Sequence, residues 1–101
     1  MTKTAIVTGA SRGIGREIAK RLAADGFAVA VNYAGSAAQA EETANEIRNA
    51  GGTATMIKAN VSDESEVAHL FEYTKKALGQ IDVIVHNAGI MLLSPIVKND
   101  I

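Results

Sequence analysis

The sequence contains no cysteine, no tryptophan and only one proline among its 101 residues. Without cysteine, the chain forms neither a disulfide framework nor a metal site built on thiolates. Aromatic residues make up only 4% of the chain, although apolar residues as a whole make up 48%. The expected core is therefore built from Ala, Val, Ile and Leu.

An excess of charge of one sign is also lacking, because the formal net charge is −1. A nearly neutral chain argues against a nucleic-acid partner or a role at a membrane surface. The uncharged apolar runs are far too short to cross a bilayer. The first residues lead through a strand-like run into a glycine turn, which is not the pattern of a signal peptide. We therefore expect a soluble, cytoplasmic protein of one domain at most.

The stretch Thr8–Gly15 reads Thr-Gly-Ala-Ser-Arg-Gly-Ile-Gly and lies between a short apolar run, Thr4–Val7, and a helical pattern. Strand, glycine turn and helix together direct backbone N–H groups and a helix N-terminus toward a phosphate. Gly9 is expected to allow the turn, Gly13 to let the backbone approach a pyrophosphate, and Gly15 to let the helix pack closely. The spacing differs from the common G-x-G-x-x-G fingerprint, and an ordinary strand-to-helix loop is the alternative for three glycines alone.

Apolar periodicity alternates between strand-like and helical segments along the chain. Strands are predicted at residues 4–7, 27–31, 53–59 and 81–85, with helices in the intervals between them. Such alternation implies right-handed βαβ units and a parallel sheet. We predict an α/β fold of the Rossmann type, with helices on both faces and strand order 3-2-1-4. The order reverses between the first and fourth strands, which is where sheets of this kind bind ligands.

Two helix starts and one helix face carry signals of their own. Ser36 and Gln39 form a capping box before the second helix, and Asp63 and Glu66 form one before the third. In the first helix, the apolar face is predicted to begin at Ile14, because apolar residues then recur at helical spacing. These signals predict where the helices begin and which side of the first helix is buried.

Three further segments fall at the ends of predicted strands. Asn32-Tyr33-Ala34-Gly35-Ser36 follows the second strand and contains no acid, Asn60-Val61 follows the third, and Asn87-Ala88-Gly89 follows the fourth. The last of these falls at the switch point beside the glycine turn, which favours a nucleotide site there. Asn60 and Asn87 also have an alternative interpretation, since asparagine is a common turn residue.

With Thr8 before its first glycine and the run Ser11-Arg12-Gly13-Ile14-Gly15, the chain resembles the single-domain branch of the short-chain dehydrogenase/reductase family, which carries T-G-x-x-x-G-x-G here. The resemblance implies an oxidoreductase that transfers hydride between a nicotinamide cofactor and a small carbonyl or alcohol substrate, as a homo-dimer or homo-tetramer. Asn87-Ala88-Gly89 resembles the family's N-N-A-G motif, which lines the cofactor's path, with His86 in place of its first Asn. Asn60-Val61 stands where many members have Asp-Val. The resemblance implies that the Asn60 side chain accepts a hydrogen bond from the adenine amino group and that Val61 packs on the adenine ring.

Arg12 and the end of the second strand bear on the choice of cofactor. An acid at that strand end would bond the ribose 2′-hydroxyl and repel a 2′-phosphate. This chain has no acid there, and Arg12 offers a planar fork to a phosphate, the alternative being a solvated loop cation. Together these features resemble the NADP-preferring members, including bacterial β-ketoacyl-acyl carrier protein reductases. The predicted cofactor-binding residues are Thr8, Gly9, Ser11, Arg12, Gly13, Ile14, Gly15, Asn32, Tyr33, Asn60, Val61, Asn87, Ala88 and Gly89.

The family's catalytic Tyr-x-x-x-Lys pair is absent, because neither Tyr33 nor Tyr73 is followed by a lysine four positions on. No metal site is predicted either, since His69 and His86 have no carboxylate at ligand spacing. The family's enzymes are more than twice as long. We therefore expect residues 1–101 to be the N-terminal, cofactor-binding part of a single Rossmann-fold domain, with no catalytic residue assigned. A non-catalytic NADP-binding or interaction module is the alternative.

Overall fold

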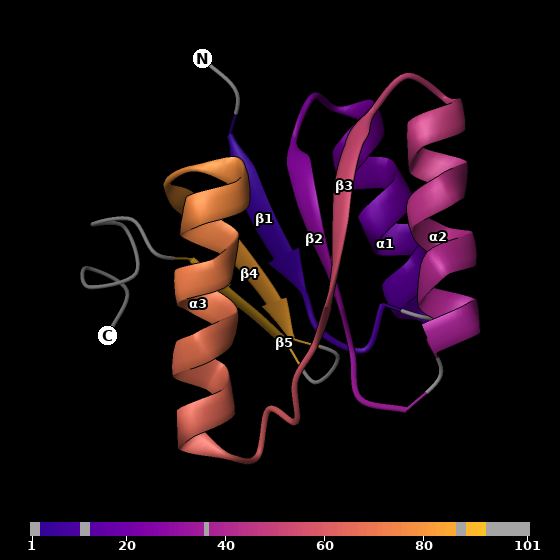
Figure 1. The fold of residues 1–101 in the computed structure, drawn as a ribbon. Coiled ribbons are helices and arrows are strands. Elements are labelled where there is room, and N and C mark those ends of the chain that lie inside the picture. The colour runs from indigo at the N-terminus through magenta and orange to yellow at the C-terminus, as the bar shows by residue number, and fades with distance from the viewer. Residues whose placement is uncertain (1–2, 11–12, 36, 87–88, 93–101) are drawn as a thin grey trace.

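The computed structural model describes residues 3–10, 13–35, 37–86 and 89–92. Strands and helices alternate along the chain, as Figure 1 shows. They are β1 (Thr4–Val7), α1 (Gly13–Ala24), β2 (Ala28–Tyr33), α2 (Ala37–Asn49), β3 (Thr53–Lys58), α3 (Glu64–Leu78), β4 (Ile81–His86) and β5 (Gly89–Leu92). The strands form a single sheet in the order β3-β2-β1-β4-β5. The predicted α/β fold and its order 3-2-1-4 are confirmed.

The first four strands are parallel, with β1 between β2 and β4 and with β3 outside β2. The fifth strand, β5, was not predicted, and it pairs antiparallel with β4 so that His86 lies opposite Gly89. A run of four residues, Gly-Ile-Met-Leu, is too short for its periodicity to separate a strand from a loop. The sheet therefore has one more strand than the apolar pattern predicts.

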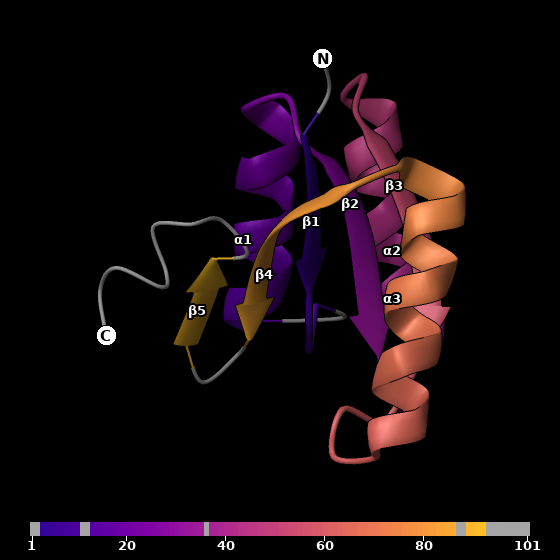
Figure 2. The same ribbon diagram turned by 90° about the vertical axis from the view of Figure 1, so that its left-hand side faces the viewer.

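The helices cover both faces of the sheet, as predicted: α1 and α2 lie on one face and α3 lies on the other (Figures 1 and 2). Neighbouring residues of β1 serve the two layers, because successive strand side chains point to opposite faces. Val7 belongs to the core cluster with α1 and α2, whereas Ile6 belongs to the cluster with Leu70 of α3. Within the described residues, no helix is both long and apolar enough to cross a membrane.

Two predicted details, the end of β2 and the buried face of α1, are wrong. Strand β2 extends through Asn32 and Tyr33, so these two residues belong to the strand rather than to the segment after it. Ile14 was expected on the buried face of α1, but it is 74% exposed. The buried positions of α1 are Gly15 and Ala19, four residues apart on the side that faces the sheet. The first turn of α1 thus packs through a glycine, and the isoleucine before it points outward.

Each helix ends shortly before a glycine with positive φ, namely Gly26, Gly51 and Gly79. The starts are less uniform. Ser36, expected to cap α2, lies outside the described residues. Asp63 does cap α3, since its carboxylate accepts hydrogen bonds from the N–H groups of Ser65 and Glu66.

Candidate functional site

The carboxyl ends of β1, β2 and β4 meet at one edge of the sheet, and the glycine turn after β1 is tied to both neighbours. The N–H of Thr8 donates to the Val85 carbonyl of β4 at 2.9 Å, and its hydroxyl donates to the same oxygen at 3.4 Å. On the other side, the N–H of Ala10 donates to the Asn32 carbonyl of β2 at 3.1 Å. The turn is thereby fixed at the point where the strand order reverses.

The conformation of the turn requires glycine at two positions, because a side chain at either would be strained or would clash. Gly9 has a φ of 62°, in the left-handed region where other residues are strained. A Cβ on Gly15 would lie 2.9 Å from the Gly9 carbonyl carbon and 3.1 Å from the Cα of Ala10, and closer still to the Gly9 oxygen. Such contacts leave no room for a side chain. Gly15 therefore seats α1 on the backbone of the turn, and this is the close packing that was expected of it.

At Gly13 the space is open, and α1 begins there. A Cβ added to Gly13 would meet no atom within 4 Å. The first N–H groups of a helix have no partner inside the helix, and they carry the positive end of its dipole. No acidic side chain lies in the first turn of α1. The turn and the helix start together fit an anionic group such as a pyrophosphate.

Several predicted contacts fall outside the described residues: Ser11, Arg12, Asn87 and Ala88. Gly89 is described as the first residue of β5.

Asn32 is buried in the sheet, with only 2% of its surface exposed. Its amide nitrogen donates to the carbonyls of Ile57 at 3.3 Å and Ala59 at 3.2 Å. Beside it, the carbonyl of Tyr33 accepts from the N–H of Ala59 at 3.0 Å. An amide NH2 has two protons, so both donors of Asn32 serve to hold the end of β3 against β2.

Asn60 forms the turn that was its alternative interpretation. Its Oδ1 accepts from the N–H of Ser62 at 3.0 Å and from the Ser62 hydroxyl at 2.6 Å. A carbonyl oxygen has two lone pairs, so the acceptor that was expected to meet an adenine amino group is already in use. The part of the Asn60 side chain that this turn leaves for a nucleobase is its NH2 donor.

The capping box at α3 is half correct. Asp63 accepts from the N–H groups of Ser65 at 2.9 Å and Glu66 at 3.4 Å. Glu66, however, accepts from the N–H of Asn60 at 2.7 Å, because the N–H of Asp63 is already donated to the Asn60 carbonyl. The Ser65 hydroxyl and N–H, followed by the N–H of Glu66, hold the pKa of Asp63 below its usual value.

A small cavity of about 130 Å³ lies between the sheet and α3, and it brings Thr8, Val61 and His86 together. The other residues that line it are Ile6, Val67, Leu70, Phe71 and Ile84. Its apolar lining suits the role expected of Val61, which is to pack against a ring.

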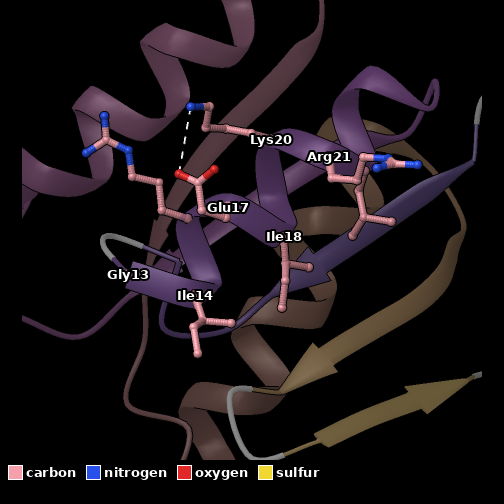
Figure 3. A pocket seen from close by; sticks show the side chains of 8 residues that line it. Gly13, Ile14, Glu17, Ile18, Lys20 and Arg21 are labelled. Atoms are coloured by element: carbon pink, nitrogen blue, oxygen red, sulfur yellow. Dashed lines mark ion pairs between the residues drawn. The ribbon is translucent and has the colours of Figure 1, made fainter.

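A more open groove, of about 800 Å³, lies along the outer side of α1. Figure 3 shows Ile14 and Ile18 on one side of it, and Lys20 paired with Glu17 on another. It reaches the glycine turn only through Gly13 and Ile14. An exposed helix surface of this kind is not the switch point, so size alone does not identify the site.

One charged cluster beside the turn was not predicted. Arg16, in the first turn of α1, pairs through its two terminal nitrogens with Glu42 at 2.7 Å and with Glu46, both on α2. Lys20 pairs with Glu46 at 3.0 Å and with Glu17 at 3.8 Å. The Arg16 contacts cross 26 residues or more of sequence, so no local spacing in the chain reveals them.

Tyr73 lies away from this edge, and the described residues form no metal cluster. Tyr73 lies on α3, 44% exposed, with its ring centroid 6.4 Å from that of His69. In the parts of the chain that the structure describes, no three His, Asp or Glu side chains gather so that they could hold a metal ion.

The sequence model of the family described as short chain dehydrogenase matches residues 3–100. Among curated proteins, the 3-oxoacyl-[acyl-carrier-protein] reductase FabG of Staphylococcus aureus is 52% identical over 90 residues, which are 89% of this chain and 37% of the relative. The trihydroxynaphthalene reductase of Colletotrichum orbiculare is 46% identical over 91 residues, 90% of this chain and 32% of the relative.

Solved structures give the same result. A dehydrogenase/reductase from Sinorhizobium meliloti 1021 superposes with a TM-score of 0.83 at 44% identity, covering 86% of this chain and 35% of that one. A short-chain dehydrogenase/reductase from Serratia marcescens has a TM-score of 0.81 at 42% identity, covering 84% of this chain and 35% of that one. The chain thus spans about a third of the length of the relatives it matches.

Proposed function

Because this chain belongs to the short-chain dehydrogenase family, we propose that it is the N-terminal, cofactor-binding part of an NADP-dependent oxidoreductase. The family uses a nicotinamide dinucleotide, and the complete protein would transfer hydride between NADPH and a carbonyl or alcohol. The observation that carries the proposal is the glycine turn. Gly15 seats α1 on the Gly9 carbonyl at the switch point, and the helix start at Gly13 is open and free of acidic side chains.

Different residues of the site would bind different parts of the cofactor. Gly9, Gly13 and the first turn of α1 would hold the pyrophosphate through backbone N–H groups. Arg12 would meet the 2′-phosphate, since no acid follows β2. Val61 would pack on the adenine ring, and Asn60 would donate its NH2 to a ring nitrogen, since its oxygen serves the Ser62 turn. Thr8 acts indirectly, by fixing the turn to β4.

The substrate class follows from the relatives. One is named as a reductase of oxoacyl groups on acyl carrier protein and another as a reductase of trihydroxynaphthalene. The proposal for this protein is correspondingly a small-molecule carbonyl or alcohol, acted on in the cytoplasm by a homo-dimer or homo-tetramer. Residues 87–89 would line the cofactor's path toward that substrate.

The test uses the complete protein that contains these residues. Titration followed by cofactor fluorescence should give a dissociation constant for NADPH at least about tenfold below that for NADH. NADPH oxidation should then be seen with a panel of ketones. Equal affinity for the two cofactors would refute the NADP assignment.

One other candidate remains, a non-catalytic NADP-binding or interaction module. Such a module would bind NADPH but give no turnover even as the complete protein. Residues 1–101 alone should give no turnover under either function, since the family's acid/base pair is missing from them.

A further inference from the structure

We propose that Arg16 is a positioning residue for cofactor choice: it neutralises Glu42 and Glu46 of α2, so that these carboxylates do not repel the 2′-phosphate of NADPH. The inference rests on the proposed NADP site. It assigns to Arg16 an indirect role, through the two acids, and leaves direct contact with the phosphate to Arg12.

The contacts of Arg16 commit it to α2. Its two terminal nitrogens bind a carboxylate each, on Glu42 and Glu46, and only 23% of its side chain is exposed. A guanidinium held at both ends in this way is not available as a second ligand for a phosphate. Arg16 also follows Gly15 directly, so its backbone belongs to the turn of α1 that rests on Gly9.

Glu42 lies close to the carboxyl edge of the sheet, where the cofactor is proposed to bind. Helices α1 and α2 pack side by side on one face (Figure 1), and each follows a parallel strand, so both begin at the carboxyl edge of the sheet. Glu42 lies five residues into α2 and Arg16 three residues into α1, which places them about 7.5 Å and about 4.5 Å along their helices. Both distances are within the Debye length of about 8 Å at physiological salt. Glu46 lies nine residues into α2, about 13.5 Å along the helix, so its charge reaches the edge only at low salt, where the Debye length grows to about 30 Å.

The balance of charge is what Arg16 controls. Arg16 and Lys20 face the three carboxylates of Glu17, Glu42 and Glu46. Without Arg16, one cation faces three anions, and Glu42 and Glu46 of α2 lose their closest partner. A 2′-phosphate carries about two negative charges near neutral pH, whereas the 2′-hydroxyl of NADH carries none. The added repulsion therefore acts on NADPH and spares NADH.

The experiment measures NADPH and NADH affinity of the complete protein by fluorescence titration, at low salt and at about 0.5 M salt. Arg16→Gln should weaken NADPH binding about three- to tenfold and change NADH binding by less than about twofold, with a smaller difference at high salt. Adding Glu42→Gln and Glu46→Gln to Arg16→Gln should restore the NADPH affinity. Restoration by removing the acids is a result that a purely structural role of Arg16 does not give.

Two matched variants complete the test. Lys20→Gln removes a cation from the same cluster one helical turn further from the edge, so its effect should be smaller than that of Arg16→Gln. Arg16→Lys keeps the charge but loses the fork, and should keep the ratio of the two affinities even where a melt shows lower stability. Equal losses for both cofactors in Arg16→Gln, or no loss, would overturn the inference. Failure of the proposed NADP site is seen separately, as equal affinities in the wild type.

Discussion

Helices α1 and α3 both begin at the carboxyl edge of the sheet, on opposite faces, and their N-termini are built in opposite ways (Figure 2). At α3 the chain supplies its own anions. Asp63 caps the helix, Glu66 in the first turn accepts from the N–H of Asn60, and Glu64 is a second acid in that turn. At α1 there is no acid in the first turn, and a Cβ at Gly13 would point into open space.

The two helix starts differ in what balances the positive charge and the unpaired N–H groups of their first turns. Every helix start has unpaired N–H groups and a positive end of its dipole. The α3 start meets that need with side chains and is therefore closed to a ligand. Under the proposed function, the pyrophosphate of the cofactor meets that need at the α1 start, and the open space at Gly13 leaves room for it.

The largest effect is expected from closing the α1 turn itself. Gly15→Val places side-chain atoms against the Gly9 carbonyl and the Cα of Ala10, which must move. Overpacking of this kind costs about 1–3 kcal/mol or more, and the displaced turn should lower NADPH affinity by over about a hundredfold. Thermal melting and NADPH titration of the complete protein measure both effects. Gly35→Ala is the matched control, because nothing lies within 4 Å of its added Cβ. A Gly15→Val protein that binds NADPH normally would contradict the role of the turn.

Arg12→Ala is expected to have the next largest effect. A hydrogen bond to a charged group contributes about 1.5–3 kcal/mol, which corresponds to a ten- to hundredfold loss of NADPH affinity. Binding of NADH should be nearly unchanged, since NADH has no 2′-phosphate. Parallel titrations of the wild type and the variant with both cofactors measure the difference. If affinity for both falls equally, Arg12 holds the loop or the pyrophosphate instead.

At α3 the expected effect is smaller and concerns stability alone. Asp63→Ala removes the acceptor for the N–H groups of Ser65 and Glu66, so the melting temperature should fall by a few degrees. Asp63→Asn keeps an acceptor oxygen and should lose less. Neither variant should change the ratio of NADPH to NADH affinity. A clear change in that ratio would mean that the two helix starts are not independent.

The smallest effect is the pH dependence of the same cap. The pKa of Asp63 is lowered in the folded protein by the bonds from Ser65 and Glu66. A carboxyl group with a lowered folded pKa contributes stability above its unfolded pKa, and the contribution is lost as the pH falls through the folded value. The melting-temperature difference between the wild type and Asp63→Asn should therefore be constant near neutral pH and should narrow below about pH 4. A difference that widens with acid would contradict this sign.

The sequence predicts the frame of the site better than its side-chain contacts. The strand order and the turn at Gly9 and Gly15 could be predicted from local patterns. The glycine spacing and the alternation of strands and helices are both visible in short stretches of consecutive residues. Ile14 shows the limit: its apolar character predicts burial, but the glycine beside it makes the contact. The partners of Arg16 and the direction of Asn32 depend on how separate elements pack, which no local spacing encodes.

Asn32 has a consequence for redesign of the protein toward NADH. A designer would place an acid at the end of β2 to bind a ribose hydroxyl. At position 32 that acid would replace an amide that donates to the Ile57 and Ala59 carbonyls. A carboxylate has no proton to donate, so its oxygens would face those carbonyl oxygens in a buried place, with no hydrogen bond between them. The substitution would weaken the contact between the ends of β2 and β3 rather than change the preference for NADPH over NADH. Position 33, half-buried at the last residue of β2, is the first place where an engineered cofactor switch leaves the link between β2 and β3 intact.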